Sequence, residues 1–162
     1  MDQQIGEGVL MEPKVEFVCE FSARLAPAQQ VGETAHGTRS IFYVAEGIVE
    51  GPHLRGRVLP GGGDWLLRRP DGVGELDVRI TIETSDGALL YVTYRGYSYD
   101  REPGMLGPLE NREANSPEQR YFVTAPFFET ASAQYAWLTR IVCIGIGTRT
   151  PEGVSYRLFA IR

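Results

Sequence analysis

The chain has 162 residues, of which 43% are hydrophobic and 23% are charged, as in an ordinary globular protein rather than a disordered one. Its net charge of −5 argues against a nucleic-acid partner, since phosphate backbones attract basic surfaces. The longest apolar run, Ile141 to Ile146, is far shorter than the ~20 residues of a membrane-spanning helix, so no membrane partner is expected.

The beginning of the sequence lacks the basic segment and apolar stretch of a secretory signal. We expect residues 1–13 to form a flexible tail, residues 14–162 to form one β-barrel domain, and the protein to be cytoplasmic. Cys19 and Cys143 each lie within a strand-like run, which favours reduced, buried thiols over a disulfide.

Hydrophobic and polar residues alternate along much of the chain, which is the pattern of half-buried β-strands. The alternation is clear at residues 15–25 and 75–84. Further strands are predicted at residues 39–50, 54–59, 65–69, 88–97, 120–124, 135–147 and 154–161. About eight closely spaced strands without a strong amphipathic helix predict an all-β fold, a mostly antiparallel barrel that is closed or nearly closed.

Residues 99–119 break this pattern, because they are rich in proline, glycine and charged side chains. Loops of this length are uncommon in small domains and serve as lids or as solvated excursions. The sequence leaves both alternatives open for this segment, which is placed to cap one mouth of the barrel.

The motifs of metal and nucleotide sites are missing. His36 and His53 are the two histidines, and neither has the spacing of a zinc site. The glycines at 61–63 are not followed by the lysine of a phosphate-binding loop. We therefore expect no metal and no cofactor.

Asp64 is the strongest candidate for catalysis. It follows a glycine-rich turn and precedes Trp65, which would place its carboxyl group against an apolar wall. Such a wall raises the pKa of a carboxyl group and suits it to act as a general acid or base.

Asp77 and Arg79 are two residues apart on one predicted strand, so their side chains point to the same face. If that face lines the barrel, the pair could polarise a carbonyl group; if it faces solvent, it is a routine surface pair. Periodicity favours the surface, whereas burial of the outer face in an oligomer would favour the lumen. Arg57 has the same ambiguity.

Several aromatic residues could form the wall of a ligand pocket or simply part of the core. They are Tyr91, Tyr94, Tyr121, Tyr135 and Trp137. Glu129 follows two phenylalanines and is a second candidate carboxylate.

The stretch Gly51–Trp65, GPHLRGRVLPGGGDW, resembles the signature of a domain-of-unknown-function family of small bacterial and fungal proteins. Residues 71–79, 84–87, 121–130 and 135–138 resemble its later segments in the same order, and the likeness extends from Val15 to Ile161. The resemblance implies a cofactor-free antiparallel barrel that is often an oligomer, and it implies small cyclic substrates. The family more often has arginine where Val123 stands, which would imply a less charged ligand here.

Two functions fit these expectations. The first is a cofactor-independent cyclase, dehydratase, isomerase or lyase of secondary metabolism, acting on a small aromatic or polyketide-like molecule. Asp64 would be the acid or base, Arg79 would stabilise an oxyanion and Asp77 would orient Arg79. The substrate would contact Trp65, Arg57, Tyr91, Tyr121, Glu129, Tyr135 and Trp137. The alternative is a non-catalytic barrel that binds or carries the same kind of ligand. In either case the partners are a small molecule and further copies of the chain, as a dimer or larger homo-oligomer.

Overall fold

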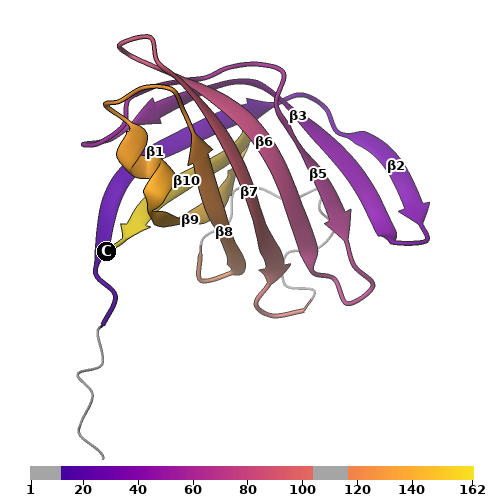
Figure 1. Ribbon diagram of the computed structural model, residues 1–162. Helices are drawn as coiled ribbons and strands as arrows, with labels where there is room; N and C mark the ends of the chain where they lie inside the picture. Colours follow the sequence, from indigo (N-terminus) through magenta and orange to yellow (C-terminus); the bar gives the residue numbers. More distant parts are fainter. Residues whose placement is uncertain (1–11, 104–116) are drawn as a thin grey trace, which may run out of the picture.

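The computed structural model describes residues 12–103 and 117–162, which form one sheet of ten antiparallel strands (Figure 1). The strands are β1 (Val15–Leu25), β2 (Gln29–Thr34), β3 (Gly37–Glu50), β4 (Gly56–Val58), β5 (Gly63–Arg68), β6 (Gly74–Thr84), β7 (Leu89–Asp100), β8 (Arg120–Glu129), β9 (Val142–Thr150) and β10 (Gly153–Ile161). A short 3-10 helix, η2 (Ala136–Arg140), precedes β9.

The sheet closes on itself, because β1 pairs with β10 on one side and with β3 on the other. Between β3 and β6 the wall is made by two short strands in succession, β4 and β5, each of which pairs with both neighbours. The result is a closed, eight-stranded antiparallel barrel with two extra strands, as the alternation of the sequence predicted. Closure satisfies the backbone hydrogen-bonding groups that an open sheet would leave at its edges.

The core lies inside the barrel, on the face predicted by the period of two. In β6 the even-numbered apolar residues from Leu76 to Ile82 are buried, while Asp77 and Arg79 point outward. One end of the barrel is filled by large side chains that are almost wholly buried, among them Leu54, Leu90, Leu138 and Leu158.

Helix η2 covers this packed end. It contributes the buried Leu138, and the preceding Tyr135 donates a hydrogen bond of 2.9 Å from its hydroxyl to the Asp86 carboxylate in the β6–β7 turn. The strand predicted at residues 135–147 is therefore wrong in its first part. Thr139 donates its hydroxyl hydrogen to the Ala136 carbonyl, a local contact that competes with an extended strand.

The β2–β3 hairpin was not predicted. Its first strand, Gln29–Thr34, is polar and mostly exposed, so it carries no hydrophobic alternation. It pairs with β3 alone and extends the sheet beyond the barrel wall (Figure 1).

The predicted loop begins later than expected, because β7 continues to Asp100 and the Arg101 N–H donates to the Gln119 carbonyl. Residues 104–116, which make up most of that loop, lie outside the described residues, as do residues 1–11 of the predicted tail.

The cysteines are free and buried, as expected, and burial raises the pKa of Cys19 to about 12. Within the described ranges, no helix is long and apolar enough to cross a membrane.

Candidate functional site

Two adjoining cavities lie inside the barrel, away from the packed end. The inner cavity has a volume of about 40 Å³ and holds Asp64, Tyr94 and Tyr156 among apolar residues. The outer cavity has a volume of about 60 Å³ and is lined by Ser98 and by Arg68, Arg120 and Arg149. Asp64 and Phe122 line both, so the two cavities form one path along the barrel axis.

The glycine-rich turn before Asp64 lets β5 approach its two neighbours closely. A Cβ atom on Gly62 would lie 2.4 Å from the Arg79 carbonyl oxygen, and one on Gly63 would lie 2.8 Å from the Phe42 carbonyl oxygen. Gly61 has a φ of +101°, a conformation that L-residues with a side chain rarely adopt. These glycines therefore fix the position at which Asp64 enters the barrel.

The pairing of β5 with β6 is interrupted next to Asp64. Paired residues are Gly63–Arg79 and Asp64–Val78, and the pairing resumes only at Leu67. In the gap the Asp77 backbone N–H donates to Asp64 Oδ1 over 3.1 Å, and the Trp65 carbonyl accepts a hydrogen bond from Arg39 Nη1. The side chains of Asp64 and Arg39 thus take the place of backbone hydrogen-bond partners for the Asp77 N–H and the Trp65 carbonyl. The first of these bonds holds the Asp64 carboxylate in one orientation.

Burial raises the pKa of Asp64 to about 7, and burial is the largest cause of the shift. The hydrogen bond from the Asp77 N–H lowers the pKa, the negative charge of Asp77 raises it, and the positive charge of Arg39 lowers it. A carboxyl group with a pKa near neutrality can both accept and donate a proton at physiological pH.

Tyr94 and Tyr156 lie beside Asp64 in the inner cavity. Their rings meet edge to face with centroids 5.5 Å apart. Burial is the main cause that raises the pKa of both phenols, and the charge of Asp64 raises both further. Both tyrosines therefore stay neutral and can donate hydrogen bonds.

The register of the barrel explains this grouping. Asp64 of β5 is opposite Val78 of β6, and Val78 is opposite Tyr94 of β7. Neighbouring antiparallel strands present opposed residues on the same face. Asp64 and Tyr94 consequently enter the barrel at the same level, two strands apart.

Arg120 is the most deeply buried charged residue of the outer cavity, with 4% of its surface exposed. Its Nε donates to Ser98 Oγ over 2.7 Å, and its Nη1 lies 2.8 Å from Asp100 Oδ1. These two contacts, both with β7, orient the guanidinium group at the end of the barrel opposite η2.

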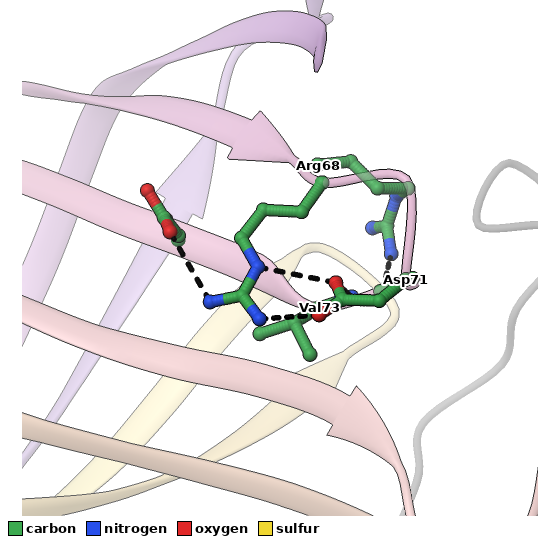
Figure 2. A network of polar contacts seen from close by, with 6 residues as sticks. Arg68, Asp71 and Val73 are labelled. Atoms are coloured by element: carbon green, nitrogen blue, oxygen red, sulfur yellow. Dashed lines mark hydrogen bonds and ion pairs between the residues drawn. The ribbon is translucent and has the colours of Figure 1, made fainter. Parts of the chain in front are cut away.

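Arg68 stands at the same end, next to the β5–β6 turn shown in Figure 2. Its Nη1 donates to the Gly72 carbonyl over 3.0 Å. Asp71 binds the Arg69 guanidinium and also accepts the Val73 N–H, and Arg69 reaches Glu75 as well. This network holds the turn that carries Arg68 in place.

The structure separates the three residues predicted to act in catalysis. Asp64 lies inside the barrel, whereas Asp77 and Arg79 lie on the outer face of β6, with 36% and 48% of their side chains exposed. Arg79 Nη1 is 3.3 Å from Asp77 Oδ1, and its guanidinium lies over the Trp65 ring, which is also outside. Of the two readings that the sequence allowed for this pair, its position matches the surface pair.

The other predicted substrate contacts do not line either cavity. Tyr91 and Glu129 are opposed on the outer face, Tyr121 stacks on Tyr99 there, and Arg57 pairs with Glu83 over 3.2 Å. At the packed end, Tyr135 binds Asp86, and Trp137 contacts His53 and Arg162. These residues have structural partners outside the path that Asp64 lines.

Sequence reasoning missed Tyr156 and the three arginines as members of a site. The signal was present in the strand period, since Arg68 is in phase with Asp64, and Ser98 is in phase with Tyr94. A charged side chain on the inward-facing side of a strand, such as Arg68, was not recognised as lining a cavity.

Comparison with known proteins identifies the family. The protein-family model described as "Protein of unknown function (DUF3237)" matches residues 13–161 of the chain. The chain belongs to this family. That assignment confirms the expected membership of a domain-of-unknown-function family.

A similar sequence and two similar solved structures agree with the barrel. A UPF0311 protein of Rhodopseudomonas palustris is 34% identical over 146 residues, which cover 89% of this chain and 95% of the relative. The crystal structure of a conserved protein of unknown function from that organism superposes with a TM-score of 0.88 at 30% identity, covering 94% of this chain and 99% of the other. A β-barrel-like protein of Acinetobacter baumannii has a TM-score of 0.79 at 30% identity, with 94% and 99% covered.

A more distant relative carries the name of an activity. The hydroalkoxylation enzyme phnH of Penicillium herquei is 26% identical over 133 residues, which cover 82% of this chain and 73% of that protein. Val123, the position at which the resemblance implied arginine in relatives, lies beside Trp65 and Asp77 in a groove on the outer face. The residue at this position therefore does not set the charge of the inner path.

Proposed function

We propose that this DUF3237 protein is a cofactor-independent acid–base enzyme that acts on a small aromatic or polyketide-like molecule in the barrel. The observation that carries the proposal is Asp64, a carboxyl group with a pKa of about 7 inside an apolar cavity and beside two neutral phenols. Acid–base catalysis is most efficient when the pKa of the catalytic group lies near the working pH.

The reaction class that fits best is addition of a hydroxyl group across a carbon–carbon double bond within one molecule, which closes a ring. The name of the relative from Penicillium herquei, a hydroalkoxylation enzyme, supports this choice. The O–H bond and the π bond break while a C–O bond and a C–H bond form, so no oxidant or reductant is needed. Asp64 takes the hydroxyl proton and returns a proton to the carbon.

The two tyrosines have a separate role. When the double bond is conjugated to a carbonyl group, addition places negative charge on the carbonyl oxygen. Hydrogen bonds from Tyr94 and Tyr156 stabilise that charge in a site from which water is largely excluded. The same groups can run the reverse elimination or move a double bond, so dehydratase, lyase and isomerase chemistry belong to the same proposal.

The proposal is tested with 2′-hydroxychalcone, whose phenol adds to its enone to give flavanone with a large change in absorbance. We expect the protein to accelerate ring closure over the buffer rate, and in D₂O the product to gain one deuterium on carbon. Asp64→Asn should lower the acceleration on the order of 100-fold or more. Glu83→Gln, an outer-face carboxylate removed in the same way, should leave it unchanged.

Two results would overturn the enzyme assignment. One is ring closure that is equally fast with wild-type protein and with Asp64→Asn. The other is a compound that is retained after buffer exchange with its mass and structure unaltered, which would identify the chain as a binding or carrier barrel.

A further inference from the structure

The outer cavity has a charge that the acid–base chemistry does not use. Among the described residues that line it, three are arginines, and Asp64 is the one carboxylate. Arg120 and Arg149 lie on the neighbouring strands β8 and β9, whereas Arg68 lies on β5, which pairs with neither and reaches the same cavity because the wall is curved. A chain with a net charge of −5 thus places three guanidinium groups at this mouth, one of which, that of Arg120, pairs with Asp100.

We propose that these arginines bind a carboxylate of the same substrate whose reacting group lies beside Asp64. The inference rests on the proposed function and names its substrate class: a molecule with an acidic group at one end, an apolar middle and a hydroxyl group or double bond at the other. The planar, multiply donating guanidinium group suits the two oxygens of a carboxylate.

Arg120 is buried and held in a fixed position beside the cavity. Burying a guanidinium group is costly unless it is paired and hydrogen-bonded, and the fold supplies Ser98 and Asp100 for this purpose. Both partners lie on β7, so they fix the plane of the guanidinium group beside the cavity wall. A preorganised donor of this kind loses little side-chain freedom when it binds an anion.

The spacing along β5 sets the length of the occupant. Asp64 and Arg68 are four residues apart on one strand, so their backbone positions are about 13 Å apart. The wall between them is apolar, with Leu66, Leu76 and Phe122 among the residues that line the outer cavity. The apolar middle of the proposed occupant would contact this stretch, with polar groups at both ends.

The Asp64 end and the arginine end of the path through the two cavities are electrostatically distinct. Besides burial and a hydrogen bond, the charges that act on Asp64 are those of Asp77 and Arg39, which belong to the outer face and to β3. The three arginines can therefore be changed without removing the groups that tune Asp64. This separation allows anion binding and proton transfer to be tested one at a time.

The probes are 3-(4-hydroxyphenyl)propanoate and its neutral amide, which differ in the charge of the end group. Binding to the full chain is measured by titration calorimetry at pH 8 and low salt. We expect the acid to bind about ten-fold or more tightly than the amide, as a charge-assisted hydrogen bond warrants. Arg149→Gln should reduce this preference to about two-fold, and Arg68→Gln provides a second variant if the first does not fold.

The matched control is Arg157→Gln. It removes the same charge from the outer face of β10, where Arg157 lies over Phe17 and Phe159. We expect this variant to keep the preference for the acid. Asp64→Asn should also keep it while losing ring closure, which distinguishes the anion site from the proposed reaction.

Three results would overturn the anion site. They are equal affinities of the wild-type protein for acid and amide, no binding of the acid at millimolar concentration, and a preference lost as much in Arg157→Gln as in Arg149→Gln. Equal affinities together with ring closure that depends on Asp64 would leave the proposed function standing and refute the carboxylate site alone.

Discussion

Asp64 accepts a hydrogen bond from the backbone of Asp77 over 3.1 Å, although the side chains of the two residues lie on opposite sides of the barrel wall. The carboxylate inside the barrel therefore replaces a missing backbone partner between β5 and β6. Asparagine keeps an oxygen at the same place, so Asp64→Asn removes the titrating group and keeps this hydrogen bond.

The first prediction concerns the pH dependence of stability. The pKa of Asp64 is about 7 in the folded protein against 3.8 in the unfolded chain, so the folded state binds more protons between these values. The free energy of unfolding contributed by Asp64 therefore falls as the pH rises through this window. Asp64→Asn should gain up to about 4 kcal/mol relative to wild type between about pH 4 and pH 8.

Urea unfolding of both proteins across this range measures the difference. Other carboxylates titrate in both proteins alike, so their contributions cancel when the curves are subtracted. Glu83→Gln serves as the control, with a difference from wild type that stays nearly constant. A flat difference for Asp64→Asn would show that Asp64 is ionised throughout.

The second prediction uses the two charges that act on Asp64 in opposite directions. Arg39→Gln removes a positive charge that lowers the pKa of Asp64, so the titration midpoint should move above that of wild type. Asp77→Asn removes a negative charge that raises the pKa, so the midpoint should move below it. Carbon-detected NMR of the Asp64 carboxyl group gives both midpoints without an activity assay. Shifts in the same direction would contradict the assigned causes.

The fold was predictable because a period of two is a local property of the chain. Alternation at residues 15–25 and 75–84 specified half-buried strands, and their number and spacing specified a barrel. The polar strand β2 and the helix η2 escaped, because the first has no apolar face and the second lies in a run rich in apolar residues.

The cavity was only partly predictable. The turn that precedes Asp64 singled it out, since three successive glycines before a carboxylate are a local signal. Periodicity favoured the outer face for Asp77 and Arg79, but the sequence left the inward face of β6 open, and the structure places both side chains outside. The meeting of Arg68 with Arg120 and Arg149 depends on the curvature of the wall between β5 and the paired strands β8 and β9, and no local pattern contains that information.

The third prediction concerns the buried pair of Arg120 and Asp100, whose side chains are 4% and 14% exposed. Arg120→Met removes the guanidinium group that faces the Asp100 carboxylate, and breaking one side of such a pair costs about 3–5 kcal/mol. The double variant Arg120→Met with Asp100→Asn should recover a large part of this loss. Urea unfolding of the wild type, Arg120→Met, Asp100→Asn and the double variant measures the coupling energy between the two residues. A double variant as unstable as Arg120→Met alone would contradict this coupling.

The last prediction tests how tightly the cavity wall is packed. A Cβ atom on Gly147 of β9 would lie 2.8 Å from the ring of Phe122, which is 6% exposed and lines both cavities. Gly147→Ala must therefore displace the ring, at a cost of about 1–3 kcal/mol for overpacking. In a Phe122→Leu background the new methyl group has room, and the cost of Gly147→Ala should fall below about 1 kcal/mol.

Thermal and urea unfolding of the four proteins in this cycle give the interaction energy between the two positions. An equal cost of Gly147→Ala in both backgrounds would show that strain in the β9 backbone, rather than contact with Phe122, opposes the side chain. If the contact is the cause, the displaced ring narrows the path from the arginines to Asp64. Gly147→Ala should then weaken binding of 3-(4-hydroxyphenyl)propanoate as well as stability, and Phe122→Leu should restore both together.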